Sequence, residues 1–228
     1  MGESTTDFLI LQINPYVAVG LGGIGLAIVL ALQFSVRRYI PWIYWLAVTM
    51  VAVFGTMAAD AVHIQLGVPY LTSTIFFLVV LAVVFAAWYK VEHTLSIHSI
   101  TSRQREVFYW SAVMATFALG TAAGDMTAFT LHLGFLSSVL LFAAAIALVS
   151  LAYWLFHLDE IIAFWFAYIL TRPLGASVAD WIGKSHSSSG LGFGDGNISM
   201  LLAVFIVIFV GYMTFDRREA KRERIAVR

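Results

Sequence analysis

Three aspartates stand at the end of short runs of small residues inside otherwise apolar stretches of the chain. Asp60 closes FGTMAAD, Asp125 closes GTAAGD and Asp180 closes GASVAD. A charge inside a membrane costs at least about 2.5 kcal/mol, so acids at such positions indicate a role beyond packing. Carboxylates that face one another cannot all stay ionised without cations or protons beside them. The chemistry that fits these residues is the binding and movement of a cation.

Two histidines follow these aspartates at helical spacing. His63 comes three residues after Asp60, and His132 comes seven residues after Asp125, so each pair shares one face of a helix. Carboxylate and imidazole together suit a first-row divalent metal such as Mn²⁺ or Zn²⁺. The alternative for each histidine is an interfacial side chain that hydrogen-bonds to backbone or water. The spacing therefore predicts auxiliary metal ligands beside the carboxylates.

An arginine lies inside an apolar stretch: Arg172 stands eight residues before Asp180 and directly before Pro173. Arginines within membrane helices usually have a partner and a function. We expect Arg172 to be the counter-ion of an aspartate in a neighbouring segment, where it competes with the transported cation. Binding of an anionic substrate is the alternative.

Composition places these residues in a membrane protein. Of the 228 residues, 61% are apolar and 11% are charged, whereas a water-soluble domain has roughly 25% charged residues. The absence of cysteine excludes disulfides and thiolate metal sites. No P-loop, zinc-protease signature or Ser-His-Asp pattern is present, which argues against an enzyme. The expected partners are the lipid bilayer and a small inorganic cation, with no nucleic acid and no resident cofactor. The sequence does not indicate an oligomeric state.

Seven segments have the length and apolarity of membrane-spanning helices, which need about 20 residues. They are residues 16–35, 39–64, 70–90, 107–132, 134–157, 160–183 and 197–215, preceded by a shorter apolar piece at 3–13. The predicted fold is an all-α polytopic membrane protein with seven to eight transmembrane helices. One side of the membrane receives Arg37, Arg38, Lys90, Arg103, Arg105 and the tail 217–228, and the other receives only Lys184. The positive-inside rule makes the first side, with the C-terminus, cytoplasmic.

Internal repeats organise these segments. Three stretches align without gaps: YWLAVTMVAVFGTMAAD (44–60), YWSAVMATFALGTAAGD (109–125) and FWFAYILTRPLGASVAD (164–180). In each, an aromatic pair stands 11 residues before a glycine, and an aspartate follows five residues after that glycine. GESTTD at residues 2–7 is a fourth copy of the glycine-to-aspartate spacing. We predict four tandem two-helix repeats, about 1–37, 38–92, 103–157 and 158–216, in one transmembrane domain (1–216) followed by a basic cytoplasmic tail (217–228).

Small residues in the motif predict close helix contacts, because small side chains at i and i+4 let backbones approach in membranes. The pairs are Gly55 and Ala59, Gly120 and Gly124, and Gly175 and Ala179. Thr56 and Thr121, next to two of the glycines, are expected to hydrogen-bond between helices. The aromatic pairs predict an interfacial belt, with a ring around a cytoplasmic pore as the alternative. These pairs are Tyr44-Trp45, Tyr109-Trp110 and Phe164-Trp165.

The first repeat departs from the others, because the sequence starts one residue before its motif glycine, Gly2. A helix of about 13 residues covers only about 20 Å, less than the hydrocarbon core of roughly 30 Å. The first helix therefore looks truncated: either the true start lies upstream, or this element is short and partly inserted. Glu3 and Asp7 would supply the acids of this repeat.

The chain resembles a family of bacterial, uncharacterised membrane-anchored proteins built from four tandem two-helix repeats. The resemblance is carried by RYIPWIYWLAV, TLSIHSI, YWSAVMATFALGTAAGD and FWFAYILTRPLGASVAD. The resemblance implies eight helices and does not indicate a biochemical activity.

From the residues themselves we expect a cation transporter in the bacterial inner membrane, above all for a divalent metal such as Mn²⁺, coupled to protons. The expected carriers are Asp60, Asp125, Asp180, Glu3 and Asp7. The alternative is a non-transporting scaffold or sensor, in which the aspartates only hydrogen-bond to neighbouring helices.

Overall fold

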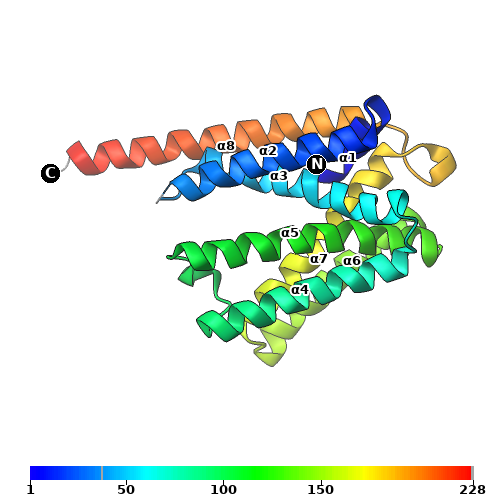
Figure 1. Ribbon diagram of the computed structural model, residues 1–228. Helices are drawn as coiled ribbons and strands as arrows, with labels where there is room; N and C mark the ends of the chain where they lie inside the picture. The colour runs from blue at the N-terminus through cyan, green and yellow to red at the C-terminus, as the bar shows by residue number, and fades with distance from the viewer. Residues whose placement is uncertain (37, 227–228) are drawn as a thin grey trace.

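The computed structural model describes residues 1–36 and 38–226, with side chains through Asp216 (Figure 1). The described residues form eight α-helices and no strand, which confirms the predicted all-α fold. They are α1 (Gly2–Gln12), α2 (Pro15–Ser35), α3 (Pro41–Asp60), α4 (Tyr70–Glu92), α5 (Arg103–Asp125), α6 (Gly134–Phe156), α7 (Glu160–Gly183) and α8 (Asp195–Ala226). Arg37 and residues 227–228, which the sequence assigns to the basic side, lie outside the described residues.

Seven of the described helical segments are long and apolar enough to cross a membrane. They are Pro15–Ser35, Pro41–Gln65, Tyr70–Glu92, Arg103–Thr130, Gly134–Phe156, Glu160–Gly183 and Asp195–Asp216. All seven predicted spans are thus confirmed, with small differences at their ends. α1 has 11 residues. At 1.5 Å per residue it is about 16 Å long, so it is too short to span the hydrocarbon core. α8 continues as a helix beyond its apolar part, to Ala226.

Local sequence signals explain several helix boundaries. Pro15 and Pro41 lie in the first turns of α2 and α3, where the missing N–H of proline removes no helical hydrogen bond. Asp159 caps α7, since its carboxylate accepts hydrogen bonds from the first backbone N–H groups of that helix. α4 and α6 each end at a histidine in the left-handed conformation, His93 and His157, both with a φ of 54°.

The odd-numbered helices form an inner ring. α3 packs against α5, α5 packs against α7, and α1 contacts both α3 and α7. The even-numbered helices lie outside, each on the inner helix that follows it in the chain: α2 on α3, α4 on α5 and α6 on α7. α8 completes the pattern by packing on α1. Each helix pair therefore rests on the next, and the last pair rests on the first.

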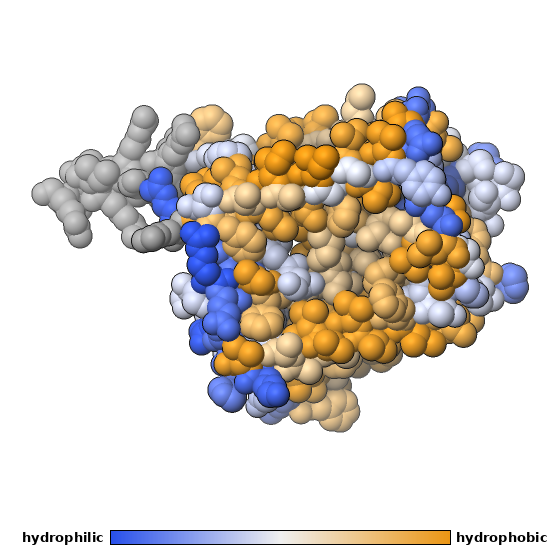
Figure 2. All heavy atoms as spheres, viewed as in Figure 1, coloured by the Kyte–Doolittle hydropathy of each residue, from blue (hydrophilic) through white to orange (hydrophobic). Residues whose placement is uncertain are grey.

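The outer helices turn apolar side chains away from the ring. Exposed examples are Leu21, Ile24 and Ile28 of α2, Leu78, Val79 and Val83 of α4, Leu140 and Leu148 of α6, and Val204, Val207 and Ile208 of α8. Apolar residues cover the middle of the face in Figure 2, and hydrophilic residues gather at its two ends. Because a lipid core accepts apolar surface and rejects unpaired polar groups, this distribution fits a membrane-embedded bundle.

The two ends of the bundle differ in what they carry. One end holds the α2–α3 and α4–α5 connections with Arg38, Lys90 and Arg103, and we call it the basic end. The other holds α1, the last turns of α3, α5 and α7, and the α7–α8 loop, and we call it the motif end.

Candidate functional site

The motif glycines bring neighbouring inner helices together. A Cβ added at Gly55 of α3 would lie 2.6 Å from the Cβ of Phe117 on α5. A Cβ added at Gly120 of α5 would collide with the Cβ of Arg172 on α7. Gly124, one turn further along, has a looser contact, 3.6 Å from the Cβ of Ala176. The predicted packing role is therefore confirmed for Gly55 and Gly120, where only glycine fits without a shift of the helices.

Gly175 does not follow this pattern. A Cβ there would meet nothing within 4 Å, so the packing role predicted for Gly175 is wrong. Its ring neighbour, α1, begins at Gly2, whose own added Cβ would lie 2.6 Å from the backbone oxygen of Ala52 on α3. Gly175 instead borders a cavity of about 210 Å³ in the ring. The paired small residues of the motif, Ala59 and Ala179, are buried as expected.

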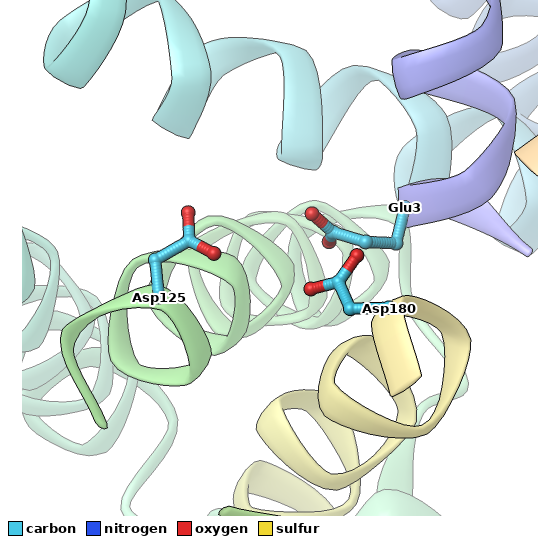
Figure 3. Close-up of side chains that lie close together, drawn as sticks. All are labelled: Glu3, Asp125 and Asp180. Carbon is cyan, nitrogen blue, oxygen red and sulfur yellow. The ribbon is translucent and has the colours of Figure 1, made fainter. Parts of the chain in front are cut away.

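Three carboxylates from three inner helices meet at the motif end. Oxygens of Glu3 (α1), Asp125 (α5) and Asp180 (α7) all lie within 4.8 Å of one another, and their side chains reach the same space in Figure 3. Two oxygens bound to one ion at about 2.4 Å each lie at most about 4.8 Å apart, so these separations are compatible with one cation shared by the three carboxylates. Asp180 is only 4% exposed. Within the described residues its carboxylate has no hydrogen-bond or ion-pair partner, and the positive charges of the Met1 amino group and Lys184 act on it only from beyond ion-pair distance.

The first repeat contributes Glu3 rather than its motif aspartate. Glu3 stands one residue after the motif glycine, where the second and third repeats have Thr56 and Thr121. The Thr121 hydroxyl donates a hydrogen bond to Glu3 (2.8 Å), and it also lies 3.1 Å from the hydroxyl of Thr56, as expected for interhelical bonds. This position is four residues, or about 6 Å along a helix, below the aspartate position.

Asp7, the motif aspartate of the first repeat, has another partner. Its carboxylate accepts a hydrogen bond from the Lys184 ammonium at 2.6 Å, and Asp195 lies 3.6 Å from the same nitrogen. Burial disfavours the charged form of Lys184, but the charge and hydrogen bond of Asp7 outweigh it and raise the pKa of Lys184. Asp7 is thus paired with a lysine, and of the two acids predicted as carriers in the first repeat only Glu3 joins the group of three.

Asp60 lies on the same ring without joining the group of three. One of its carboxylate oxygens, Oδ2, is buried and has no hydrogen-bond partner among the described residues. Asp60 and Asp125 are each followed directly by a π-helical turn, Ala61–Gln65 and Met126–Thr130. Such turns are rare and occur often at functional sites. Their recurrence in two repeats marks both aspartates as positions where the helix is locally widened.

The two histidines lie apart from the three carboxylates. The His63 ring stacks on Tyr70 with centroids 3.3 Å apart, and its Nδ1 bonds to the backbone oxygen of Val68 at 2.5 Å. His132 adopts a positive φ of 55° in the turn before α6. Sharing a helical face with an aspartate did not bring either imidazole to the group, because the chain leaves the α-helix between them. The structure therefore supports the backbone-bonded alternative for His63, and it places His132 in an exposed turn outside the group.

Arg172 is not the counter-ion of an aspartate. Its guanidinium carbon lies 4.1 Å from the ring centroid of Phe117 and 4.2 Å from that of Tyr168. No carboxylate pairs with it among the described residues, and its Nε is buried without a hydrogen-bond partner. The predicted ion pair is wrong because Arg172 lies two turns before Asp180 in α7, level with aromatic residues rather than acids.

The aromatic pairs lie inside the ring and form no belt at the surface. Trp110 and Trp165 are buried, and the Trp165 indole donates a hydrogen bond to the backbone oxygen of Leu95. The hydroxyls of Tyr44 and Tyr109 lie 2.7 Å apart. A cavity of about 940 Å³ at the basic end is lined by Tyr44, Tyr109, Trp110, Phe164 and Tyr168, among others. Four members of the three pairs thus border this cavity, and Trp45 is half-buried. The ring around a cytoplasmic pore stays a prediction.

The structure adds two residues that the sequence motifs did not mark. Tyr168 lines the large cavity and contacts Arg172, although its equivalents in the repeats are valines. Lys184 balances Asp7, although it seemed only to be the lone basic residue of one side. Glu3 was already among the expected carriers, and the alignment of repeats marks it as well, because it stands where two other repeats have threonine.

The sequence matches a family model described as a Repeat of Unknown Function (DUF347) over residues 43–94, 108–158 and 163–219, more than half of the chain. The chain belongs to the DUF347 repeat family. The three DUF347 units coincide with the pairs α3–α4, α5–α6 and α7–α8, whereas α1 and α2 lie outside the matched residues. No curated protein and no solved structure matches the chain. The description of the DUF347 family assigns no activity.

Proposed function

We propose that this protein transports a divalent metal ion such as Mn²⁺ across the membrane by binding it between Glu3, Asp125 and Asp180. The proposal is carried by the meeting of these three carboxylates, within 4.8 Å of one another, inside an apolar bundle. Acids at membrane depth are costly, and like charges this close repel one another. A bound divalent cation relieves both penalties. Binding of the cation from one side of the membrane and its release to the other side constitute transport.

The donor set favours a hard divalent cation. All three grouped side chains offer carboxylate oxygen, and the nearest supporting group is the Thr121 hydroxyl on Glu3. Oxygen ligands suit Mg²⁺, Ca²⁺ and Mn²⁺, whereas Zn²⁺ and Cu²⁺ favour sites with nitrogen or sulfur. With His63 and His132 elsewhere, the expectation of Mn²⁺ or Zn²⁺ narrows to Mn²⁺ and ions of similar chemistry.

Two cavities support a route to this group from the basic end. The larger, of about 940 Å³, lies at the basic end itself, and the smaller, of about 210 Å³, borders Glu3. Tyr168 lines the first cavity, Arg172 lines the second, and the two side chains touch. The positive-inside rule favours a cytoplasmic basic end, here in a bacterial inner membrane. Protons are the proposed exchange partners, because they can replace the cation on the carboxylates.

A scaffold or sensor would hold its acids in fixed pairs with arginine, threonine or tryptophan. Within the described residues Asp125 and Asp180 form no hydrogen bond or ion pair, and Arg172 contacts aromatic rings instead. Only Glu3 has such a bond, from Thr121. Unpaired acids at the centre of a ring support transport over a purely structural role.

Uptake of Mn²⁺ into vesicles that hold the purified protein and a metal-quenched fluorescent dye tests the proposal. We expect Asp180→Asn and Asp125→Asn each to reduce uptake at least tenfold. Asp159→Asn is the matched control, because asparagine also caps a helix and Asp159 lies at the start of α7, away from the group. Wild-type uptake no greater than that of protein-free vesicles, or unaltered uptake in both variants, would refute the proposal.

A further inference from the structure

Arg172 is a buried cation that lacks a carboxylate partner. The faces of Phe117 and Tyr168 hold its guanidinium carbon at 4.1 and 4.2 Å from their centroids. Its Nε is buried and donates no hydrogen bond among the described residues. An arginine has five N–H donors arranged for a carboxylate, and aromatic faces satisfy its charge but not these donors. The observed position therefore leaves Arg172 able to gain hydrogen bonds by moving to an acid.

The space for such a movement is present beside it. The cavity of about 210 Å³ is bordered both by Arg172 and by Glu3, together with Thr56, Thr121 and Gly175. Gly175 stands three residues after Arg172 and has nothing within 4 Å of where a Cβ would be. Because Gly120 is packed against the Cβ of Arg172, the helix itself is fixed, and only the outer part of the side chain is free to turn into the cavity.

We propose that Arg172 is a tethered competitor of the transported cation: when the cation leaves, the guanidinium turns from Phe117 and Tyr168 through the cavity and binds Glu3. This inference rests on the proposed transport function and names the residue that sets its affinity. A carboxylate accepts a guanidinium in a two-bond fork, so Arg172 keeps the emptied Glu3 from remaining an unpaired buried charge. The next metal ion binds only by displacing Arg172, which lowers the apparent affinity and promotes release.

Mn²⁺ affinity, measured by titration calorimetry on the purified full-length protein, separates the competitor from a merely structural arginine. We expect Arg172→Ala to bind Mn²⁺ at least about tenfold more tightly, equivalent to about 1.4 kcal/mol, because no competitor remains. In the vesicle assay the same variant should show a lower KM and a lower kcat, since release is no longer assisted. Arg172→Lys keeps a tethered cation and should restore most of the wild-type affinity.

A second variant tests the movement while the charge stays in place. Gly175→Leu places a side chain in the cavity between Arg172 and Glu3, and we expect the same tightening of Mn²⁺ binding. Gly211→Leu on α8 is the matched control, because a Cβ there also meets nothing within 4 Å but the site lies away from the cavity.

The possible outcomes distinguish this inference from the transport proposal. If wild type binds Mn²⁺ and Asp180→Asn abolishes binding, but neither Arg172→Ala nor Gly175→Leu tightens binding, the competitor role of Arg172 is refuted and the transport site stands. Tightening in Arg172→Ala without tightening in Gly175→Leu refutes the movement, since the charge alone then explains the change. Absence of Mn²⁺ binding by the wild-type protein overturns both proposals.

Discussion

Alanine at Gly120 and alanine at Gly175 should have opposite effects on stability, although both glycines hold the same place in the repeat. At Gly120 the new methyl group would collide with the Cβ of Arg172, with the carbonyl carbon of Arg172 at 3.0 Å and the nitrogen of Pro173 at 3.1 Å. These are backbone and Cβ atoms, which cannot turn aside as the end of a flexible side chain can. α7 would have to move away from α5. At Gly175 the methyl group meets nothing within 4 Å.

The expected magnitude follows from two terms. Replacing a helical glycine by alanine stabilises a helix by about 0.5–1 kcal/mol, and this term is common to both variants. Overpacking a tight contact costs about 1–3 kcal/mol, and this term applies only at Gly120. Gly175→Ala should therefore stabilise the protein by about 0.5–1 kcal/mol. Gly120→Ala should be less stable than Gly175→Ala by the full overpacking cost, about 1–3 kcal/mol.

Reversible unfolding of the purified protein in mixed detergent micelles, followed by far-UV circular dichroism, gives both free energies of unfolding. Gly211→Ala on α8 is the control for the helix term, because its Cβ also meets nothing within 4 Å. Equal stability of the Gly120 and Gly175 variants would refute the reasoning, since it would mean that the close contact between α5 and α7 does not depend on glycine.

Three further predictions concern the polar groups around the ring. His63→Ala should leave the Mn²⁺ affinity within twofold of wild type in calorimetry, because the imidazole bonds to a backbone oxygen instead of joining the carboxylates. A tenfold loss of affinity would show that His63 is a metal ligand after all. Lys184→Met should lower the free energy of unfolding by about 2 kcal/mol by leaving Asp7 unpaired, and adding Asp7→Asn should recover most of that loss. Thr121→Val removes the donor to the α1 glutamate and should weaken Mn²⁺ binding by about fivefold. Thr116→Val, whose hydroxyl bonds only within its own helix, should not. Equal affinities of these two threonine variants would contradict the supporting role of Thr121.

Much of the fold follows from features that are local in the chain. Each spanning helix must satisfy its own backbone in lipid, so a run of about 20 apolar residues predicts a helix whatever its neighbours are. The seven spans and the short α1 were predictable for this reason. The contacts of Gly55 and Gly120, and the Thr56–Thr121 bond, were predictable because the repeat places the same residues at the same level on adjacent helices.

The candidate site was less predictable, because it depends on how four helices are rotated and staggered in the ring. Asp125, Asp180 and Glu3 were all among the expected carriers, and the structure brings these three together. Repeat symmetry alone would have placed Asp7 there, but Lys184 reaches Asp7 from a loop that is 177 residues away in the chain. The sequence spacing of His63 assumed one continuous helix, whereas a π-helical turn follows Asp60.

By itself, the sequence determined a membrane-embedded helical protein built from repeats, with an acidic residue at the same position of each repeat. Hydrophobic length and residue spacing are properties of single segments, so they can be read without the tertiary structure. Only the tertiary structure decided which acids meet. It also showed that Arg172 lies between aromatic rings and that Gly175 opens onto a cavity. The physical reason is that side-chain partners across helices are set by ring closure, in which α1 and α8 join the two ends of the chain. No spacing within a single repeat encodes that closure.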